Sequence, residues 1–244
     1  MYGWKPGLPD HRAKKFKLKT PIPVPPPSVD SLTAFIVAWD QGNLGSCTAH
    51  GTGRIWSHRY AVEKATQNPP IPSRLFIYYN ERALDGTIGQ DAGAAVSDGL
   101  NVLANLGAPL ESDWPYDVSQ FAIKPPDQAY TDALQEIALQ YEAVNVDLTS
   151  IKQALAAGNP ITMGFTVFES FEESWAVPGM MPMPNPSEQV LGGHCVCMDG
   201  YDDSKNAFHC MNSWGTGWGL SGGFWMPYAN LTNCDDFWVL TAIK

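Results

Sequence analysis

Three residue types that together perform acyl-transfer chemistry occur in order along this chain. Cys47 ends the run Gln-Gly-Asn-Leu-Gly-Ser-Cys, which begins at Gln41. His194 follows 147 residues after Cys47, and Asn212 follows 165 residues after it. A thiol attacks a carbonyl as the thiolate, an imidazole can take its proton, and a carboxamide can orient that imidazole. Gln41, six residues before the thiol, is placed to donate an N–H to a developing oxyanion. The pattern therefore indicates covalent catalysis by Cys47.

Two segments carry a resemblance to a known family. The run Gly45-Ser46-Cys47 and the sequence Asn-Ser-Trp-Gly-Thr-Gly-Trp-Gly over residues 212–219 resemble the papain-like cysteine peptidases, from about Ser28 to the C-terminus. The flanks depart from the usual pattern. Leu44 stands where the family usually has a disulfide cysteine, Thr48 where it has Trp, and Gly193 where plant relatives carry Asp.

The resemblance implies a two-lobe α+β fold, with a helical lobe, an antiparallel β lobe and the active site in the cleft between them. It implies a thiol endopeptidase that works through a thioester and needs no metal or organic cofactor. His194 would be the base and Asn212 would fix its tautomer, while the amide of Gln41 and the backbone N–H of Cys47 would hold the oxyanion. Trp214 would shield the hydrogen bond between His194 and Asn212 from water.

The same resemblance implies a substrate site. Gly93 matches the glycine that pairs with extended substrate backbone, and residues 234–236 should form the floor of the pocket for the second residue upstream of the cut. That pocket would favour an apolar or small residue, and an Asp in its floor would invite a basic one. The substrate-binding residues expected are Gly93, Ala94, Ala95, Val96, Gly164, Cys195 and Trp214.

Other interpretations of these residues stay open. An acyl transferase or amidase would use the same three groups with an amine in place of water, and an inactive peptide-binding protein would keep only the scaffold. His50 lies one helical turn from Cys47, so it points along the same helix and is expected to pack rather than act as the base. A zinc site would need His194, Cys195, Cys197, His209 and Cys210, but these lack a paired Cys-x-x-Cys spacing.

The elements that must position these groups follow from periodicity and capping signals. Helices are expected at residues 47–63, after the capping Ser73, at 91–106 before Gly107, and at 147–155. Strands are expected at 161–168, 194–201, 208–213, 224–228 and 237–243, separated by Gly, Pro, Asn and Asp. Helices first and strands afterwards predict an α+β protein. Cys47 would then start a helix, where the helix dipole favours a thiolate.

Charge separates the N-terminus from the rest of the chain. Residues 1–19 carry a net charge of +5 and the remainder −15, with a Pro-rich stretch over 20–28 between them. We expect a basic N-terminal extension over residues 1–20, a propeptide-like lid, and a catalytic domain over 21–244 with a helical lobe at about 47–120 and a β lobe at about 140–230. The alternative is a disordered tail. An acidic body argues against nucleic-acid binding.

Composition and cysteine usage indicate the class of protein and the compartment in which it works. With 44% hydrophobic and 16% charged residues, the chain is typical of globular proteins. It has neither an apolar run near 18 residues, which argues against a membrane span, nor the apolar core of a signal peptide at its N-terminus. The first half holds one cysteine of five, so we expect free buried thiols and a reducing compartment. The expected partners are polypeptide substrates and a proteinaceous inhibitor, and the protein is expected to be a monomer.

Overall fold

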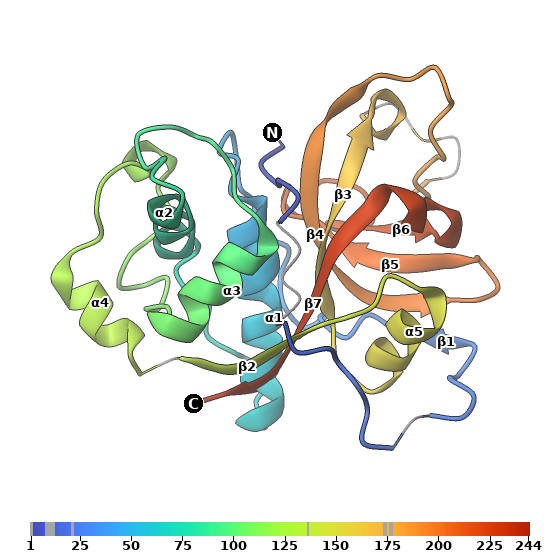
Figure 1. Cartoon of the computed structure of the whole chain (residues 1–244), viewed down its shortest axis with the longest axis horizontal. Helices are drawn as coiled ribbons and strands as arrows, with labels where there is room; N and C mark the ends of the chain where they lie inside the picture. The colour runs from blue at the N-terminus through green and yellow to red at the C-terminus, as the bar shows by residue number, and fades with distance from the viewer. Residues whose placement is uncertain (1, 8–12, 21, 136, 173–174, 176–177) are drawn as a thin grey trace.

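The computed structural model describes residues 2–7, 13–20, 22–135, 137–172, 175 and 178–244. Most of its helices gather on one side of the molecule, whereas the helix Leu148–Ala156 packs on the sheet (Figure 1). The part of the expected N-terminal extension at residues 1 and 8–12 lies outside the described residues. The helices are α1 (Cys47–Glu63), α2 (Arg74–Leu84), α3 (Val96–Asn105), α4 (Asp127–Ala133) and α5 (Leu148–Ala156), with 3₁₀ turns at Val118–Gln120, Glu169–Phe171 and Tyr228–Asn233.

A seven-stranded sheet forms the other side (Figure 1). Its strands are β1 (Ser28–Val29), β2 (Ala138–Ala143), β3 (Ile161–Phe168), β4 (Val190–Asp202), β5 (Ala207–Met211), β6 (Gly223–Pro227) and β7 (Cys234–Ile243). Neighbouring strands follow the order β2-β7-β3-β4-β5-β6, with β1 on β4, and every pair is antiparallel. The α+β class and the two-lobe arrangement expected from the sequence are therefore confirmed.

Helix α1 lies where the two sides meet and is buried around almost its whole circumference. It contacts β4 and β7 on one side and α2 and α3 on the other. A helix that is enclosed in this way has no solvent face, which explains why its sequence shows no amphipathic stripe. Trp56 on α1 packs in the core shared with the other helices, whereas Phe165, Phe208 and Phe224 fill a second core inside the sheet.

The expected elements agree with the structure where local signals are strong. Helix α1 and strand β3 have the predicted bounds, and the Oγ of Ser73 caps α2 by accepting the N–H of Phe76 at 3.2 Å. Helix α3 begins at Val96 rather than at residue 91, because the carboxylate of Asp91 accepts both the N–H of Gly45 and the hydroxyl of Tyr78, holding that segment away from a helical course. Strands β4 and β7 are both longer than predicted.

Strand β2, strand β1 and helix α4 were not predicted from the sequence. Strand β2 is exposed at two of its six positions and half-buried at another, so it carries no clear hydrophobic alternation. It is identified only by its pairing with β7, which brings residues about 100 positions apart into register, as in Tyr141 opposite Leu240. Helix α4 is seven residues long and buries only two of them, Ala129 and Ala133.

A buried carboxylate ties the segment before α1 to the sheet. Asp199 on β4 is fully buried and accepts hydrogen bonds from Ser31 Oγ at 2.5 Å, Thr33 Oγ1 at 2.5 Å and His209 Nδ1 at 2.7 Å. Burial alone would raise the pKa of Asp199, but these hydrogen bonds, led by that of His209, hold it below its usual value. The contribution of Asp199 to stability is therefore present above the unfolded pKa of about 3.9 and is lost as the pH falls through the lower folded pKa.

Replacing Asp199 by alanine should lower the free energy of unfolding at pH 7 by about 3 kcal/mol, because several buried donors lose their acceptor. The measurement is urea unfolding at equilibrium. Asp203→Ala is the matched control, since it removes an ion pair to Lys152 at 2.7 Å in which Asp203 is partly exposed, and it should cost less than about 1 kcal/mol. Equal losses for the two variants would contradict a structural role for the buried network.

Candidate active site

Cys47 is the first residue of α1 and is fully buried. Burial raises the pKa of its thiol to about 11, although backbone hydrogen bonds from Cys195 and Gly3 act in the opposite direction. The helix position was expected to favour a thiolate, but here burial outweighs that effect. The preceding Ser46 does not cap the helix with its side chain, because its Oγ hydrogen-bonds the hydroxyl of Tyr116 instead.

His194 lies on β4 and is also fully buried. Its Nε2 is 2.7 Å from Oδ1 of Asn212, and since an amide oxygen can only accept, Nε2 carries the proton. The other ring nitrogen, Nδ1, finds no hydrogen-bond partner among the residues that the structure describes. Burial lowers the pKa of His194 to about 4, against the opposing effect of Asn212. Thiol and imidazole are thus both held in their neutral forms.

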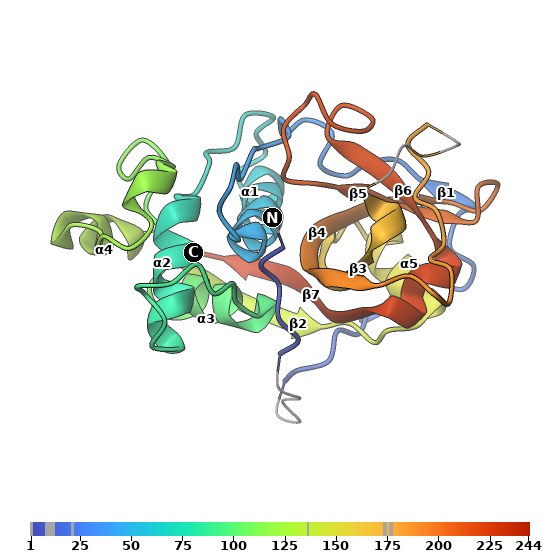
Figure 2. The ribbon, with the colours of Figure 1, turned by 90° about the horizontal axis from the view of Figure 1, so that it is seen from above.

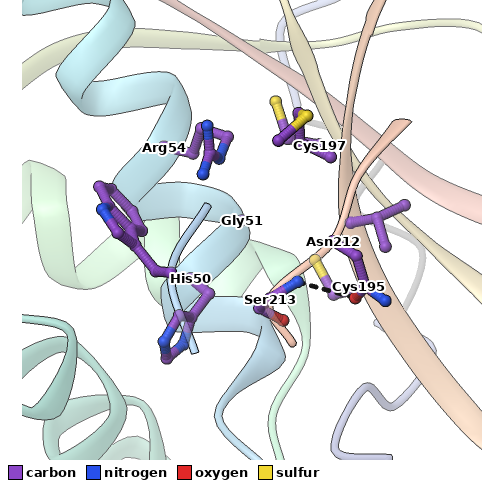
Figure 3. Close-up of a pocket in the computed structure, with 10 residues that line it drawn as sticks. His50, Gly51, Arg54, Cys195, Cys197, Asn212 and Ser213 are labelled. Carbon is purple, nitrogen blue, oxygen red and sulfur yellow. Dashed lines mark hydrogen bonds between the residues drawn. The ribbon is translucent and has the colours of Figure 1, made fainter. Parts of the chain in front are cut away.

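The carboxamide of Asn212 is itself fixed. Its Oδ1 also accepts the backbone N–H of Ser213 at 2.7 Å, the hydrogen bond drawn in Figure 3. The ring of Trp214 lies 5.0 Å from that of His194 and is tilted by 31°, and Trp218 meets Trp214 edge-on at 5.1 Å. Trp214 therefore lies directly against the His194 ring with Trp218 packed on it, and the shielding of the hydrogen bond between His194 and Asn212 stays a prediction.

Gln41 connects the loop before the thiol to the loop that carries Asn212. Its Oε1 accepts the hydroxyl of Ser213 at 2.6 Å, and its backbone N–H donates to the carbonyl of Ser213 at 2.8 Å. Its Nε2 donates to the carbonyl of Leu44 at 2.8 Å. The structure thus brings Gln41 to the same loops as Cys47 and Asn212, while its role as an oxyanion donor stays a prediction.

The N-terminal segment, residues 2–7, runs between the start of helix α3 and strand β4 (Figure 2). The N–H of Trp4 donates to Gly193 at 2.9 Å on the sheet side. On the helical side, Ala94 donates to the carbonyl of Gly3 at 2.8 Å and accepts the N–H of Lys5 at 2.9 Å, which makes a parallel bridge. The extension expected as a lid therefore contacts both sides of the cleft directly.

The N-terminal segment pairs with the neighbour of Gly93, and the pairing of Gly93 with a substrate stays a prediction. The backbone groups that pair with the segment belong to Ala94. Gly93 itself has a φ of +68°, and a Cβ placed on it would lie 1.9 Å from the carbonyl oxygen of Gly3. A side chain at Gly93 would therefore block the close approach of any chain lying over it.

Trp4 fills the pocket expected for the second residue upstream of a cut. A Cβ on Gly164 would lie 1.9 Å from the indole, and Trp4 is only 7% exposed. Its Nε1 donates to Oδ2 of Asp236 at 3.2 Å, and the same oxygen accepts the N–H of Val96 at 2.9 Å. Asp236 is thus the residue of 234–236 that meets the indole of Trp4, and its role as the floor of a substrate pocket stays a prediction.

Cys195 occupies a different place from the one expected. Its Sγ lies 3.4 Å from Oγ1 of Thr162 and lines a cavity of about 10 Å³ between α1 and the sheet, together with His50 and Cys197 (Figure 3). That space is suited to a water molecule rather than to a substrate side chain. Ala95 precedes Val96 at the start of α3, and the N–H of Val96 donates to the same carboxylate oxygen of Asp236 as the indole of Trp4.

A second attachment holds the extension on the edge strand β2. Phe16 donates to the carbonyl of Ala143 at 2.8 Å, Ala143 donates to Lys14, and Lys14 pairs with Glu142 at 2.6 Å. The charge imbalance of the sequence predicted an electrostatic attachment. The contacts of the described residues are instead mainly backbone hydrogen bonds, the buried indole of Trp4 and the half-buried rings of Tyr2 and Phe16, with this ion pair in addition.

The residues that the structure describes contain no group of three or more His, Cys, Asp or Glu side chains arranged to hold a metal ion, so the zinc interpretation gains no support. All five cysteines are free thiols, four buried and Cys234 half-buried. In the described part of the chain, no helix is long and apolar enough to span a membrane.

Comparison with known proteins decides the family. A profile of papain family cysteine proteases matches residues 26–236. The chain belongs to the papain family of cysteine proteases. The crystal structure of xylellain, a cysteine protease from Xylella fastidiosa, superposes with a TM-score of 0.91 at 36% identity, covering 100% of this chain and 96% of that one.

Curated relatives agree with this assignment. A peptidase C1-like protein of Acanthamoeba polyphaga mimivirus is 38% identical over 219 residues, which is 84% of this chain and 69% of the viral protein. A cathepsin B-like protein of Giardia intestinalis is 37% identical over 193 residues, covering 76% of this chain and 62% of that protein. The chain is therefore a papain-like cysteine peptidase, a thiol protease among the hydrolases.

The sequence predicted an N-terminal lid over the cleft, and Trp4 and Phe16 in an otherwise basic segment favoured docking, because a tail held by charge alone needs no aromatic residues. It did not identify which residue of 234–236 meets Trp4, or that the backbone of the segment pairs with Ala94.

Proposed function

We propose that this protein is a thiol endopeptidase that hydrolyses peptide bonds through a thioester. The observation that carries the proposal is a peptide segment, residues 2–7, seated over Cys47 between the His194–Asn212 pair and the backbone of Ala94. A cleft that already binds extended backbone on both sides is suited to a polypeptide substrate.

The reaction follows from the residues around the thiol. His194 Nδ1 takes the proton of Cys47, and Sγ attacks the carbonyl carbon, whose oxygen is stabilised by Gln41 and the Cys47 N–H. The C–N bond breaks as the imidazolium gives its proton to the leaving amine. His194 then activates water, which adds to the thioester, and the C–S bond breaks to restore the thiol. Asn212 keeps the imidazole in the required tautomer.

We further propose that the extension over residues 1–20 inhibits the catalytic domain over 21–244. With residues 2–7 in place, a buried neutral thiol faces a buried neutral imidazole, since burial raises the pKa of Cys47 to about 11 and lowers that of His194 to about 4. Removal of the segment would readmit water and reverse both shifts, which favours the thiolate–imidazolium pair.

The pocket that holds Trp4 defines the preference of the enzyme upstream of the cut. Its walls at Gly164, Ala95 and Val96 are small or apolar, which fits the proposed preference for an apolar or small residue at the second upstream position. The occupied pocket extends this proposal to a large aromatic residue, because it encloses a whole indole whose N–H reaches Asp236.

Product analysis with an added amine tests this function. A peptidase should release free carboxylate from a peptide library even with the amine present. An acyl transferase would yield the amide of the added amine, an amidase would release carboxylate from a small amide but not from the peptide library, and an inactive peptide-binding protein would give no product. The proposed partners are polypeptide substrates and a proteinaceous inhibitor, and neither nucleic acid nor a membrane is proposed as a partner. We propose that the protein is a monomer and needs no cofactor.

Replacing Gln41 by alanine should lower kcat by about 10²–10³-fold with little change in KM, because an oxyanion donor acts in the transition state. Steady-state kinetics on a peptide with a fluorescent leaving group measures both constants. Ser213→Ala is the control, since it removes the partner of Oε1 at 2.6 Å without removing the amide donor, and it should affect kcat much less. A change confined to KM in Gln41→Ala would assign the residue to substrate binding.

A further inference from the structure

A hollow of about 640 Å³ lies beside His194, whose ring is 5.0 Å from the ring of the lining residue Trp214. Four aromatic rings form much of its wall, and Trp214 is shared with the active site. The lining residues are Phe171, Glu172, Trp175, Pro178, Gly179, Trp214, Trp218 and Gly219. The rings pack against one another at centroid distances of 5.1–6.0 Å, so the wall is formed before any substrate binds.

Among the described residues that line the hollow, Glu172 is the charged one. Its carboxylate accepts the hydroxyl of Tyr2 at 2.5 Å, and burial together with this contact raises the pKa of the Tyr2 phenol. None of the described lining residues is basic. When the N-terminal segment leaves the cleft, Glu172 loses the hydrogen bond from Tyr2 and stands at an aromatic surface with no cation among the lining residues.

The course of the N-terminal segment shows which part of a substrate lies here. Trp4 fills the pocket for the second upstream residue, Gly3 crosses the thiol, and Tyr2 packs against His194 at 5.9 Å and Trp214 at 6.2 Å. Residues earlier in the segment thus lie further downstream in the cleft, so the segment runs opposite to a substrate. Tyr2 occupies the place of the first residue after the cut, and its side chain reaches Glu172.

We propose that this hollow binds the side chain of the first residue downstream of the cut and selects a basic one, arginine above lysine, through Glu172 and the indole faces. The inference rests on the proposed endopeptidase function. The planar guanidinium of arginine can stack on an aromatic ring while its N–H groups donate to a carboxylate. The ammonium of lysine is a compact charge that cannot stack and offers no planar pair of donors. An acidic side chain would meet the charge of Glu172 and be rejected.

Tyrosine at the same position should be accepted but ranked below arginine. The contact of Tyr2 with Glu172 shows that a phenol reaches the carboxylate. A hydrogen bond from a neutral hydroxyl to a carboxylate lacks the attraction between opposite charges that a guanidinium adds.

The test uses the full-length chain carrying Trp4→Ala, which loosens the N-terminal segment, and peptides that differ only in the first downstream residue. The residues compared are Arg, Lys, Tyr, Ala and Glu. The kcat/KM for the Arg peptide should exceed that for Ala by about tenfold, as expected when a cation–π contact and a partly exposed ion pair act together. The Glu peptide should fall several-fold below Ala.

Two substitutions at the exposed Glu172 separate charge from shape. Glu172→Gln should reduce the Arg preference to about two- to threefold, and Glu172→Lys should make Glu the better residue. Glu169→Gln is the matched control, because it makes the same charge change three residues away, outside the hollow, and should leave the ranking unchanged. Equal kcat/KM for Arg, Ala and Glu peptides, or the same ranking in Glu172→Lys, would overturn the proposal.

Binding separates failure of the hollow from failure of the proposed function. The same peptides, labelled with a fluorophore, are titrated against the Cys47→Ala, Trp4→Ala double variant and followed by fluorescence polarisation. Tighter binding of the Arg than of the Glu peptide is expected whether or not the enzyme cleaves either one. Equal affinities would overturn the proposal for the hollow, whereas preferential binding without cleavage by the enzyme with Cys47 intact would overturn the peptidase function alone.

Discussion

Replacing Cys47 by alanine should reduce peptide hydrolysis to background, a loss of about 10⁴–10⁶-fold in kcat, because no other group can form the thioester. The thiol is buried at the first position of α1, and alanine fits the same space and the helix, so the fold should be kept. Steady-state kinetics on a peptide substrate gives the loss, and circular dichroism with urea unfolding checks the fold.

Two other buried thiols provide the controls for this experiment. Cys195 lies on β4 with its Sγ beside Thr162, and Cys210 lies on β5 in the hydrophobic core of the sheet. Cys195→Ala and Cys210→Ala should each keep most of the activity. A Cys47→Ala variant that still hydrolyses peptide while either control loses activity would show that the nucleophile has been assigned to the wrong residue.

Replacing Trp4 by alanine should raise kcat/KM on a small peptide by about 10²–10³-fold. Truncating a buried tryptophan typically costs about 3–5 kcal/mol, and each 1.36 kcal/mol is a tenfold change in equilibrium. That energy now holds residues 2–7 over the thiol, so its loss should shift the segment out of the cleft. Deleting residues 1–20 should give at least as large an increase.

The reactivity of the thiol provides a readout without any substrate. With the segment in place, burial raises the pKa of Cys47 to about 11, so little thiolate is present at pH 7. Opening the cleft should lower that pKa, and the rate of alkylation by iodoacetamide at pH 7 should rise together with kcat/KM. The pH profile of alkylation should move to lower pH in Trp4→Ala.

The control for Trp4→Ala is Phe16→Ala, which truncates an aromatic residue of the same extension at β2 and outside the cleft. It should raise activity far less. Because the segment is held in the cleft by backbone hydrogen bonds and a buried indole, high salt should have little effect, in contrast to what charge alone predicted. Equal activity of wild type, Trp4→Ala and the deletion variant would show that the segment does not restrain the enzyme.

The sequence by itself determined the family of this protein and its class as a cysteine peptidase. Gln41, Cys47, His194 and Asn212 could be named because each sits in a short motif whose residues are adjacent in the chain. Helix α1 and strand β3 could be bounded because caps, glycines and periodicity act over a few residues. These are local signals, and the α+β class follows from their order along the chain.

Only the tertiary structure decided which residues contact the N-terminal segment in the cleft. Ala94 pairs with Gly3, Trp4 meets Asp236, and Tyr2 meets Glu172, and these partners are separated by about 90 to 230 positions in the chain. No periodicity encodes such pairings, because they depend on how α3 and β4 face each other after folding. The same holds for strand β2, which is defined by β7 rather than by its own residues. The neutral state of Cys47 is likewise a property of the folded molecule, since burial by distant segments outweighs the local helix dipole.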